Sequence, residues 1–343
     1  MKYEYECLCL GDADSIIIRH FQMLDGKEKA YIIVIDAGNI GDGYTIKKHL
    51  KTYYGTTHID LAICTHPDKD HKDGFFELME DEEVIVDSFW LTDPASYLDE
   101  TDIKFYSSRT SAEKAVRKIW NKSNDNKRNL IDEALRKCWN REGVYSVVAG
   151  QKHSILPFRV LAPTVDLYKE CAKKMVQDYG LKTYVDSDIK EFVEDAKVDD
   201  EEVKSVIDTC CDPSPYNASS LVILYEPGDG NKFLFAGDAT QESLQQVVND
   251  NKGLRDIFFL KVPHHGSRNN MTTPIIGALR PKKSYISAQG EGGHPDAALA
   301  YWLSKYGDVF STHLSSGYLH CGHNMGIRLG SVKINPYRAK KNN

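Results

Sequence analysis

A strand-like run that ends in a dense set of metal-ligand residues is the feature that most constrains how this chain can fold. Residues 59–65, Ile-Asp-Leu-Ala-Ile-Cys-Thr, are typical of a buried strand, and residues 66–71 that follow are His-Pro-Asp-Lys-Asp-His. Imidazole nitrogens and carboxylate oxygens are donors that divalent cations bind, and donors at alternating positions of a turn can converge on one point. The sequence therefore predicts a metal site at the end of this strand.

An ordinary polar turn is the alternative for the same six residues, because proline and aspartate both interrupt strands. That alternative accounts for the two aspartates but poorly for the two histidines among them. A short motif also gives false matches, so the rest of a metal site has to come from other parts of the chain.

Two later strand-like segments end in residues of the same kind. Asp238 follows Gly237 at the end of the run 232–236, and the adjacent His264 and His265 follow the run 257–262. The Gly-Asp pair alone is a weak indication, whereas paired histidines before a glycine are rare in a purely structural turn. Three such strand ends are hard to explain independently, and together they predict a site for two metal ions.

The predicted ligands divide between two cations. One cation would bind His66 and Asp68, the other would bind Asp70, His71 and His265, and Asp238 would lie between them. Because successive strand residues point to opposite sides, we expect His264 to face away from the ligands and to contact a transition-state oxygen or protonate the leaving group. The predicted catalytic residues are Asp70 and His264. Two neighbouring divalent cations lower the pKa of a shared water and hold the oxygens of an electrophile, which predicts hydrolysis.

Composition and charge exclude several other classes of protein. The chain has 343 residues and a formal net charge of −7, so no overall positive field draws it to nucleic acid or to an anionic membrane. No apolar run approaches the ~20 residues of a membrane-spanning helix, and there is no secretory signal. The eight cysteines show no C-x-x-C spacing, which favours free thiols and a cytoplasmic location.

The predicted elements form two β-rich parts around a different middle segment. Short β-branched runs fill the first 65 residues, and strands alternate with helices from 219 to 312. We predict an α/β fold with a single hydrolase domain over 1–343 and a helical, charged insertion at 95–215. A strand pair near 144–148 and 158–162 should return the chain to the core.

Charge is segregated within the predicted insertion. Basic residues outnumber acidic ones in 104–142, and acidic residues dominate 186–212. We favour two solvated helix faces, which could pair with each other. The alternative is that the basic half, with Trp120 and Trp139 among its cations, forms a surface for substrate or for a protein partner.

The three ligand segments resemble those of the metallo-β-lactamase superfamily, whose usual first motif is H-x-H-x-D-H. In this chain Asp68 stands where that motif has its second histidine. This aspartate version resembles the hydrolase domain of the ComEC competence proteins, and so do residues 11–15, 217–222 and 261–267 and the pair His294-Pro295. The resemblance covers about the first 90 residues and residues 150–320.

The resemblance implies an αββα sandwich with the site at the strand ends along one edge. It also implies metal-dependent cleavage of phosphodiesters, which means DNA for the ComEC proteins. Those proteins carry membrane-spanning segments for DNA uptake, and since this sequence has none, uptake is not implied. The superfamily uses a histidine between its first and fourth motifs, but His153 is the only one between His71 and Asp238. Its turn-like setting is more typical of an exposed loop residue.

Oxygen donors dominate the first predicted cation position. Asp68 supplies one in place of an imidazole, and Asn217, which stands where the third motif of the superfamily falls, could supply another. Oxygen donors suit Mn²⁺ or Mg²⁺ better than Zn²⁺. We therefore expect two divalent cations, with Mn²⁺ favoured over Zn²⁺ or Mg²⁺.

Other polar residues near these motifs are candidates for substrate contact, namely Asn217, Ser267, Arg268 and His294. Ser267 and Arg268 could hold a phosphate, although solvation equally explains an arginine after a turn. His294 could equally be a turn residue. Three C-terminal histidines lie near a cysteine without the spacing of a standard zinc cluster: His313, His320 and His323, beside Cys321.

Three functions are consistent with the sequence. The leading one is a metal-dependent phosphodiesterase or nuclease acting on DNA, RNA or a nucleotide; the negative charge favours a small phosphodiester, or DNA presented by a partner, over tight duplex binding. The second is hydrolysis of a phosphorylcholine ester, a lactone or a thioester, because fold does not fix substrate. The third is a partner-binding subunit with a vestigial metal site.

Overall fold

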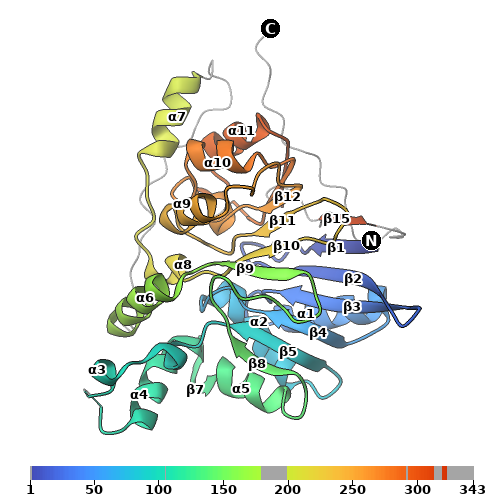
Figure 1. Ribbon diagram of the computed structural model, residues 1–343, viewed down its shortest axis with the longest axis vertical. Coiled ribbons are helices and arrows are strands. Elements are labelled where there is room, and N and C mark those ends of the chain that lie inside the picture. Colours follow the sequence, from blue (N-terminus) through green and yellow to red (C-terminus); the bar gives the residue numbers. More distant parts are fainter. Residues whose placement is uncertain (1, 105, 179–198, 291–292, 313–318, 323–343) are drawn as a thin grey trace.

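The computed structural model describes residues 2–104, 106–178, 199–290, 293–312 and 319–322. Within this part of the chain, two large sheets stack face to face, and helices cover their outer faces (Figure 1). This is the α/β architecture of the metallo-β-lactamase fold, an αββα sandwich, and it confirms the predicted fold class.

The first sheet has seven strands in the order β15-β1-β2-β3-β4-β5-β8. They are β1 (Lys2–Cys7), β2 (Ile16–Leu24), β3 (Lys27–Ile35), β4 (His58–Ile63), β5 (Ile85–Leu91), β8 (Gly143–Ser146) and β15 (Leu319–Gly322). The pairs from β15 to β3 are antiparallel, whereas β3, β4, β5 and β8 run parallel to one another. The carboxyl ends of these parallel strands therefore meet along one edge of the sheet.

The second sheet has six strands in the order β14-β13-β12-β11-β10-β9. They are β9 (Phe158–Ala162), β10 (Val222–Tyr225), β11 (Phe233–Phe235), β12 (Phe259–Lys261), β13 (Lys283–Ile286) and β14 (Asp308–Ser311). Here β9, β10 and β11 are antiparallel, and β11 to β14 run parallel. A separate hairpin consists of β6 (Asn121–Lys122) and β7 (Asp125–Asn129).

Helices pack on both sheets. The first sheet carries α1 (Asp42–His49) with the π-helical turn η1 (Leu50–Tyr54), α2 (Lys69–Glu80), α5 (Leu130–Lys137) and α6 (Val165–Asp178). The second carries α9 (Gln241–Asp250), α10 (Thr273–Leu279) and α11 (Ala297–Ser304). Shorter elements are the 3₁₀ turns η2 (Pro94–Tyr97), η3 (Arg117–Trp120) and η4 (His264–Gly266), and α3 (Glu100–Ile103), α4 (Arg109–Val116), α7 (Asp200–Asp208) and α8 (Pro215–Ala218). No helix among the described residues has the length and apolar character needed to cross a membrane.

Side chains that alternate between the two faces of each strand form three apolar layers: one between the sheets and one under the helices of each sheet. In β2, Ile16 and Ile18 point into the layer between the two sheets, whereas Ile17 points to the helices of the first sheet. This is the period of two that a strand imposes on its side chains. Leu234 and Leu260, on the outer face of the second sheet, pack against α9 and α10 in the third layer.

The middle segment joins both sheets. We expected a strand pair near 144–148 and 158–162, but the two strands do not pair with each other: β8 lies beside β5, and β9 lies beside β10. Each strand extends the edge of a different sheet, a choice that local sequence does not encode. The part between β5 and β8 forms an arm of α3, α4, the β6–β7 hairpin and α5 at the lower edge of Figure 1. That 95–215 is an insertion stays a prediction.

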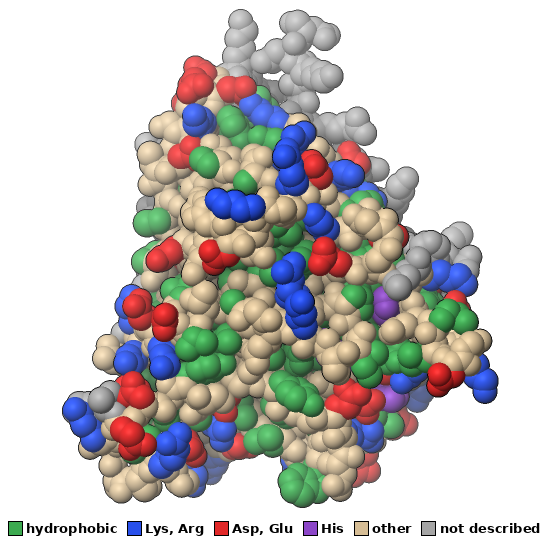
Figure 2. Space-filling model, in the orientation of Figure 1, with side chains coloured by type: hydrophobic (Ala, Val, Ile, Leu, Met, Phe, Trp, Pro, Cys, Tyr) green, Lys and Arg blue, Asp and Glu red, His purple; other side chains and the backbone are tan. Residues whose placement is uncertain are grey.

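Several basic side chains of this arm pair with acids of the sandwich or of the segment that directly follows β5. Three pairs link the arm to the sandwich: Arg128 with Glu80 at 2.9 Å, Arg141 with Asp87 at 2.8 Å and Lys122 with Glu77 at 3.6 Å. Arg117 pairs with Asp93, just after β5, at 2.5 Å. Figure 2 shows positive and negative side chains intermixed at the lower left, where α3 and α4 lie. Trp120 is buried and donates to the Thr92 carbonyl, so only Trp139, which is 75% exposed, could stack with a partner.

Candidate metal centre

The turn between β4 and α2 presents the first candidate ligands. Asp68 occupies the N-cap position of α2, where an aspartate side chain normally accepts a hydrogen bond from the first turn. The Asp68 side chain makes no such bond. Its Oδ2 lies 3.7 Å from His66 Nε2 instead, so the carboxylate is turned from its helix towards the site.

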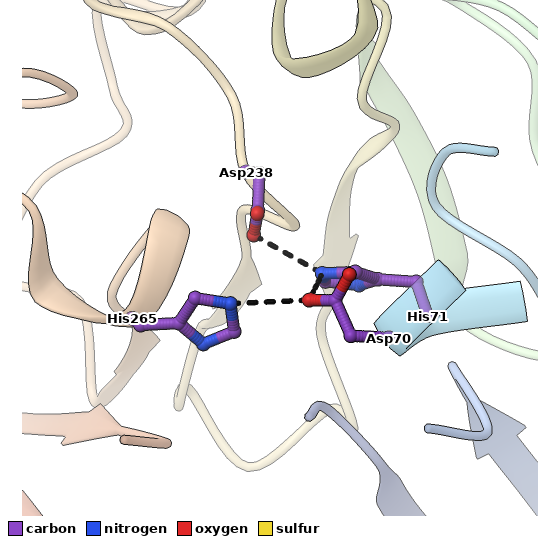
Figure 3. A group of neighbouring side chains, drawn as sticks. All are labelled: Asp70, His71, Asp238 and His265. Atoms are coloured by element: carbon purple, nitrogen blue, oxygen red, sulfur yellow. Dashed lines mark hydrogen bonds and ion pairs between the residues drawn. The ribbon is translucent and has the colours of Figure 1, made fainter. Parts of the chain in front are cut away.

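Four residues from three segments converge beside this turn (Figure 3): Asp70, His71, Asp238 and His265. One ligand atom of each lies within 4.8 Å of those of the other three. Asp70 Oδ2 is 3.3 Å from His71 Nε2 and 3.1 Å from His265 Nε2. The first turn of α2 and the segments after β11 and β12 thus bring four predicted ligands together.

Asp238 links this group to His66. Its Oδ1 lies 3.4 Å from His71 Nε2, and its Oδ2 lies 3.8 Å from His66 Nε2. The preceding Gly237 has φ +50°, and a Cβ atom there would lie 3.0 Å from the Thr65 side chain. A glycine is therefore needed to bring the aspartate this close to the β4 turn.

The histidine rings are oriented by partners on their outer nitrogens. His71 Nδ1 lies 2.9 Å from Asp36 Oδ2, and His265 Nδ1 lies 2.9 Å from the Ser287 carbonyl oxygen. Because a carbonyl oxygen only accepts, His265 Nδ1 carries the proton, and its Nε2 is the nitrogen available to a cation. Partners of this kind hold metal-ligating histidines.

The inner ring nitrogens show that the site fits a cation. His66 Nε2 and His71 Nε2 are both buried and have no hydrogen-bond partner among the described residues. A buried polar atom without a partner is costly, so such atoms call for an explanation. Three imidazoles with carboxylates are a donor set that suits divalent transition metals.

Electrostatics of the metal-free site favour protonated imidazoles beside ionised carboxylates. Burial alone lowers the pKa of His71, but the charges of Asp238, Asp36 and Asp70 outweigh it and raise the pKa well above its usual value. Burial likewise lowers the pKa of His265, and the hydrogen bond to Asp70 with the nearby carboxylates raises it overall. Burial raises the pKa of Asp70, yet His71 and His265 bring it well below the usual range.

Three residues that the sequence analysis did not single out support the ligands. Asp36 accepts from Thr65 N and Oγ1, both at 2.8 Å, in addition to contacting His71. Lys261 is buried, pairs with Asp14, and has its Nζ 3.5 Å from Asp238 Oδ1. Burial lowers the pKa of Lys261, but Asp14 and Asp238 raise it overall. Of these residues, Lys261 had a signal in the sequence, because it is a charged residue at the end of an otherwise apolar strand.

His264 and His265 lie in a strained turn. Both have a left-handed backbone, with φ +47° and +51°, which costs a non-glycine residue about 1–3 kcal/mol. We expected strand alternation to separate the two rings; the prediction of a strand here is wrong, because β12 ends at Lys261 and the histidines form η4. The turn still separates them. The His264 side chain is 22% exposed and that of His265 is 9% exposed.

A second polar group surrounds His264. Its Nδ1 lies 3.1 Å from Asn270 Oδ1 and 3.5 Å from Asp212 Oδ2. The Asn217 amide donates to the same Asp212 oxygen at 2.6 Å, and the His294 ring is centred 5.5 Å from the His264 ring. Asn217 and His294 therefore lie beside the predicted catalytic histidine. Asp212 and Asn270 were not predicted.

Two other predicted substrate residues have structural partners. Ser267 is buried, and its Oγ accepts from Asn269 N at 3.2 Å. Arg268 Nη1 lies 3.5 Å from Asp296 Oδ2, and the arginine side chain is 13% exposed. These contacts favour a role in holding the loop after η4.

The remaining histidines of the sequence analysis lie elsewhere. His153, expected to be an exposed loop residue, has a side chain only 7% exposed, so that expectation is wrong. Its Nδ1 accepts from the backbone N–H groups of Ile155 and Leu156, which explains its burial in the turn. His313 and His323 lie outside the described residues, and of His320 only the backbone, in β15, is described.

Comparison with known proteins gives one match in sequence. No family model matches the chain. Over 98 residues it is 40% identical to ComE operon protein 3 of Bacillus subtilis (strain 168). The matched stretch is 28% of this chain and spans 12% of the length of that relative. The match supports the resemblance to ComEC-type proteins.

Solved structures with similar shape are distant. A mutant of the CmlA beta-hydroxylase aligns with a TM-score of 0.46 and 13% identity, covering 94% of this chain and 54% of the other. Igni18, a metallo hydrolase from Ignicoccus hospitalis, aligns with a TM-score of 0.43 and 11% identity. The alignment covers 93% of this chain and 98% of the other. A metallo-beta-lactamase from Pontibacter korlensis aligns with a TM-score of 0.29 and 10% identity. The alignment covers 74% of this chain and 89% of the other. It is the strand order and the candidate metal-binding group that support a metal-dependent hydrolase.

Proposed function

We propose that the protein is a metal-dependent phosphodiesterase or nuclease that uses two divalent cations. The observation that carries the proposal is the position of Asp238, which directs one oxygen towards His71 and the other towards His66. A bridging ligand in a two-cation site requires this arrangement. Asp238 would be shared, His66 and Asp68 would hold one cation, and Asp70, His71 and His265 would hold the other.

Two such cations, when bound, supply a water of lowered pKa and positive charge for the phosphoryl oxygens. The chain itself supplies positioning. Asp36 and the Ser287 carbonyl fix the rings of His71 and His265, so that neither has to reorient. Lys261 offsets part of the negative charge of Asp14 and Asp238.

His264 is our candidate for contact with the reacting phosphate. It is more exposed than His265 and is held at Nδ1 by Asn270 and Asp212. The Asp212 carboxylate lies 3.5 Å from Nδ1 of this ring, and a protonated ring at this position would donate to a phosphoryl or leaving-group oxygen. Asn217 and His294 would line the same side of the substrate.

A small phosphodiester fits the surface better than a long duplex. Duplex binding rests on lysines and arginines that neutralise backbone phosphates, and four of those in the arm already pair with acids of the protein. The oxygen donors of Asp68 and Asp238 favour Mn²⁺ over Zn²⁺ in the first position. Binding of a protein partner by the charged middle segment stays a prediction.

The test is hydrolysis by wild-type and Asp238→Ala protein with Mn²⁺, Mg²⁺ or Zn²⁺. Bis-p-nitrophenyl phosphate is compared first with a lactone and a thioester. Single-stranded DNA, duplex DNA, RNA and cyclic nucleotides follow. We expect Mn²⁺-stimulated phosphodiester cleavage that the variant lacks. Cleavage confined to the lactone or thioester would replace the proposal with another ester hydrolase, and equal activity with Zn²⁺ but none with Mn²⁺ would contradict the metal preference.

A further inference from the structure

A second candidate binding site lies between the arm and α6. A partly open cavity of about 530 Å³ is lined there by η2, the segment around α3, α4 and one face of α6. Its volume falls within the range of roughly 300–1,000 Å³ that is usual for small-molecule sites. None of the candidate metal ligands lines it.

The lining of this cavity is basic although the chain as a whole is acidic. Lys104, Lys169 and Lys173 contribute to the wall, against Asp102 as the one acid. Lys173 Nζ lies 3.4 Å from Asp102 Oδ1, so one lysine already offsets that acid. Excess positive charge in a partly enclosed space favours an anion, and lysine binds phosphate as a point charge.

Aromatic and apolar side chains form the rest of the wall. Tyr97 and Tyr106 line the cavity together with Leu98, Val116 and Val176. Tyrosine rings bury large flat areas, and every nucleobase offers a flat face that stacks on such rings. The combination of cations with aromatic and apolar surface fits a ligand that has an anionic end and a planar, apolar body.

α6 is a fixed wall, because one of its faces is packed into the core. Tyr168 and Met175 are buried in the core, and Tyr168 Oη donates to the Thr92 carbonyl at 2.7 Å. Lys169 and Lys173, four residues apart, share the face towards the cavity. Lys174 lies on the other side, where Glu170, Asp212 and Glu242 line a second cavity of about 430 Å³. The acids make that second cavity unsuitable for an anion.

We propose that the cavity beside Lys169 and Lys173 binds a nucleotide, with its phosphate near the lysines and its base among the tyrosines and apolar side chains. The site is separate from the candidate metal centre, and the inference does not depend on the proposed reaction. It gives the arm a role in ligand binding that the ion pairs to the sandwich do not explain.

Calorimetric titration of the full chain in excess chelator tests this directly. The probes are AMP, ATP, adenosine and inorganic phosphate, and each is titrated into wild-type and Asp238→Ala protein. We expect AMP and ATP to bind both proteins alike, at least tenfold more tightly than adenosine or phosphate. No binding of either nucleotide at millimolar concentration would overturn the proposal, and so would binding that Asp238→Ala abolishes, because that would place the nucleotide at the metal centre.

Charge reversal then locates the site. Lys169→Glu should weaken AMP binding at least tenfold, and Lys104→Glu, on the opposite wall, should also weaken it. Lys174→Glu is the matched control on the same helix and should change the affinity for AMP less than twofold.

Thermal melting establishes that each variant is folded. If Lys169→Glu does not fold, the effect of Lys104→Glu on AMP binding still decides the test. An equal effect of Lys174→Glu would overturn the assignment to this cavity.

Discussion

The two ends of β4 carry two groups of histidine and aspartate that differ in how their polar atoms are satisfied. At the amino end, His58, Asp60 and the neighbouring Asp87 lie close enough to hold a cation. At the carboxyl end, the group around His66 and His71 does so too. The residue types are the same, so composition does not distinguish the two.

The amino-end group is satisfied within the protein. His58 Nε2 lies 2.7 Å from Asp87 Oδ2, the other Asp87 oxygen pairs with Arg141 at 2.8 Å, and Asp60 accepts from Ile32 N at 2.7 Å. The His58 side chain is 43% exposed. At the carboxyl end the Nε2 atoms of His66 and His71 are buried and have no hydrogen-bond partner among the described residues. Buried ligand atoms that the protein leaves unsatisfied, and not the number of ligand residues, indicate a metal site.

The largest expected effect is on metal content. Wild-type protein loaded with Mn²⁺ and desalted should hold two cations, and Asp238→Ala should lose both, because the shared ligand is removed. His58→Ala should keep both cations, because His58 contacts Asp87, which is already paired with Arg141. Native mass spectrometry or elemental analysis measures the stoichiometry. If His58→Ala lost metal as Asp238→Ala does, the distinction between the two ends would fail.

A smaller effect is expected at the partner of His71. Asp36 has φ +59°, a conformation that asparagine tolerates, so Asp36→Asn preserves the backbone while removing the charge that orients the ring. We expect a loss of metal affinity of about 10- to 100-fold. Asp60→Asn, at the other end of β4, is the matched control and should leave affinity unchanged. Competition with a fluorescent chelator measures both.

The residues that could be predicted from the sequence are those whose signal is local. α9 (Gln241–Asp250) lies in the part where strands were predicted to alternate with helices, and Thr240 caps it by accepting from Ser243 N. The candidate ligands at 66–71, Asp238 and His265 stood out because residues of metal-binding type directly follow apolar strands. The parallel strands then bring the residues at their carboxyl ends to one edge of the sandwich. The resemblance to the metallo-β-lactamase superfamily already implied a site at this edge.

The residues that could not be predicted depend on contacts distant in sequence. Asp212 lies in an acidic run where nothing local separates it from its neighbours, yet it contacts Asn270, 58 positions later. Asp36 resembles any aspartate after a strand until the fold places it against His71. The sheets that β8 and β9 join are likewise decided by packing, since either strand has the alternation that both sheets accept.

The pH dependence of the metal-free protein should separate the two ends further. The raised pKa of His71 means that its proton stabilises the fold below the ordinary value of 6.5, and that this contribution is lost as pH rises through the folded pKa. With chelator present, the melting temperature should therefore fall as pH increases from about 6.5 towards 9. Added Mn²⁺ should offset the fall, because the cation replaces the proton. A His71→Gln variant should show a smaller pH dependence, because the raised pKa of His265 contributes in the same direction. A wild-type slope equal to that of the variant would contradict the assignment.

The smallest effect is expected from breaking the ion pair at the amino end. Asp87→Asn removes the charge that both His58 and Arg141 contact, but these partners are 43% and 36% exposed, so solvent screens the interaction. We expect a loss of less than about 1 kcal/mol in the free energy of unfolding, measured by urea denaturation. Metal content should be unchanged. A larger loss of stability accompanied by release of a cation would mean that the amino-end group holds metal after all, and the contrast between the two ends of β4 would have to be abandoned.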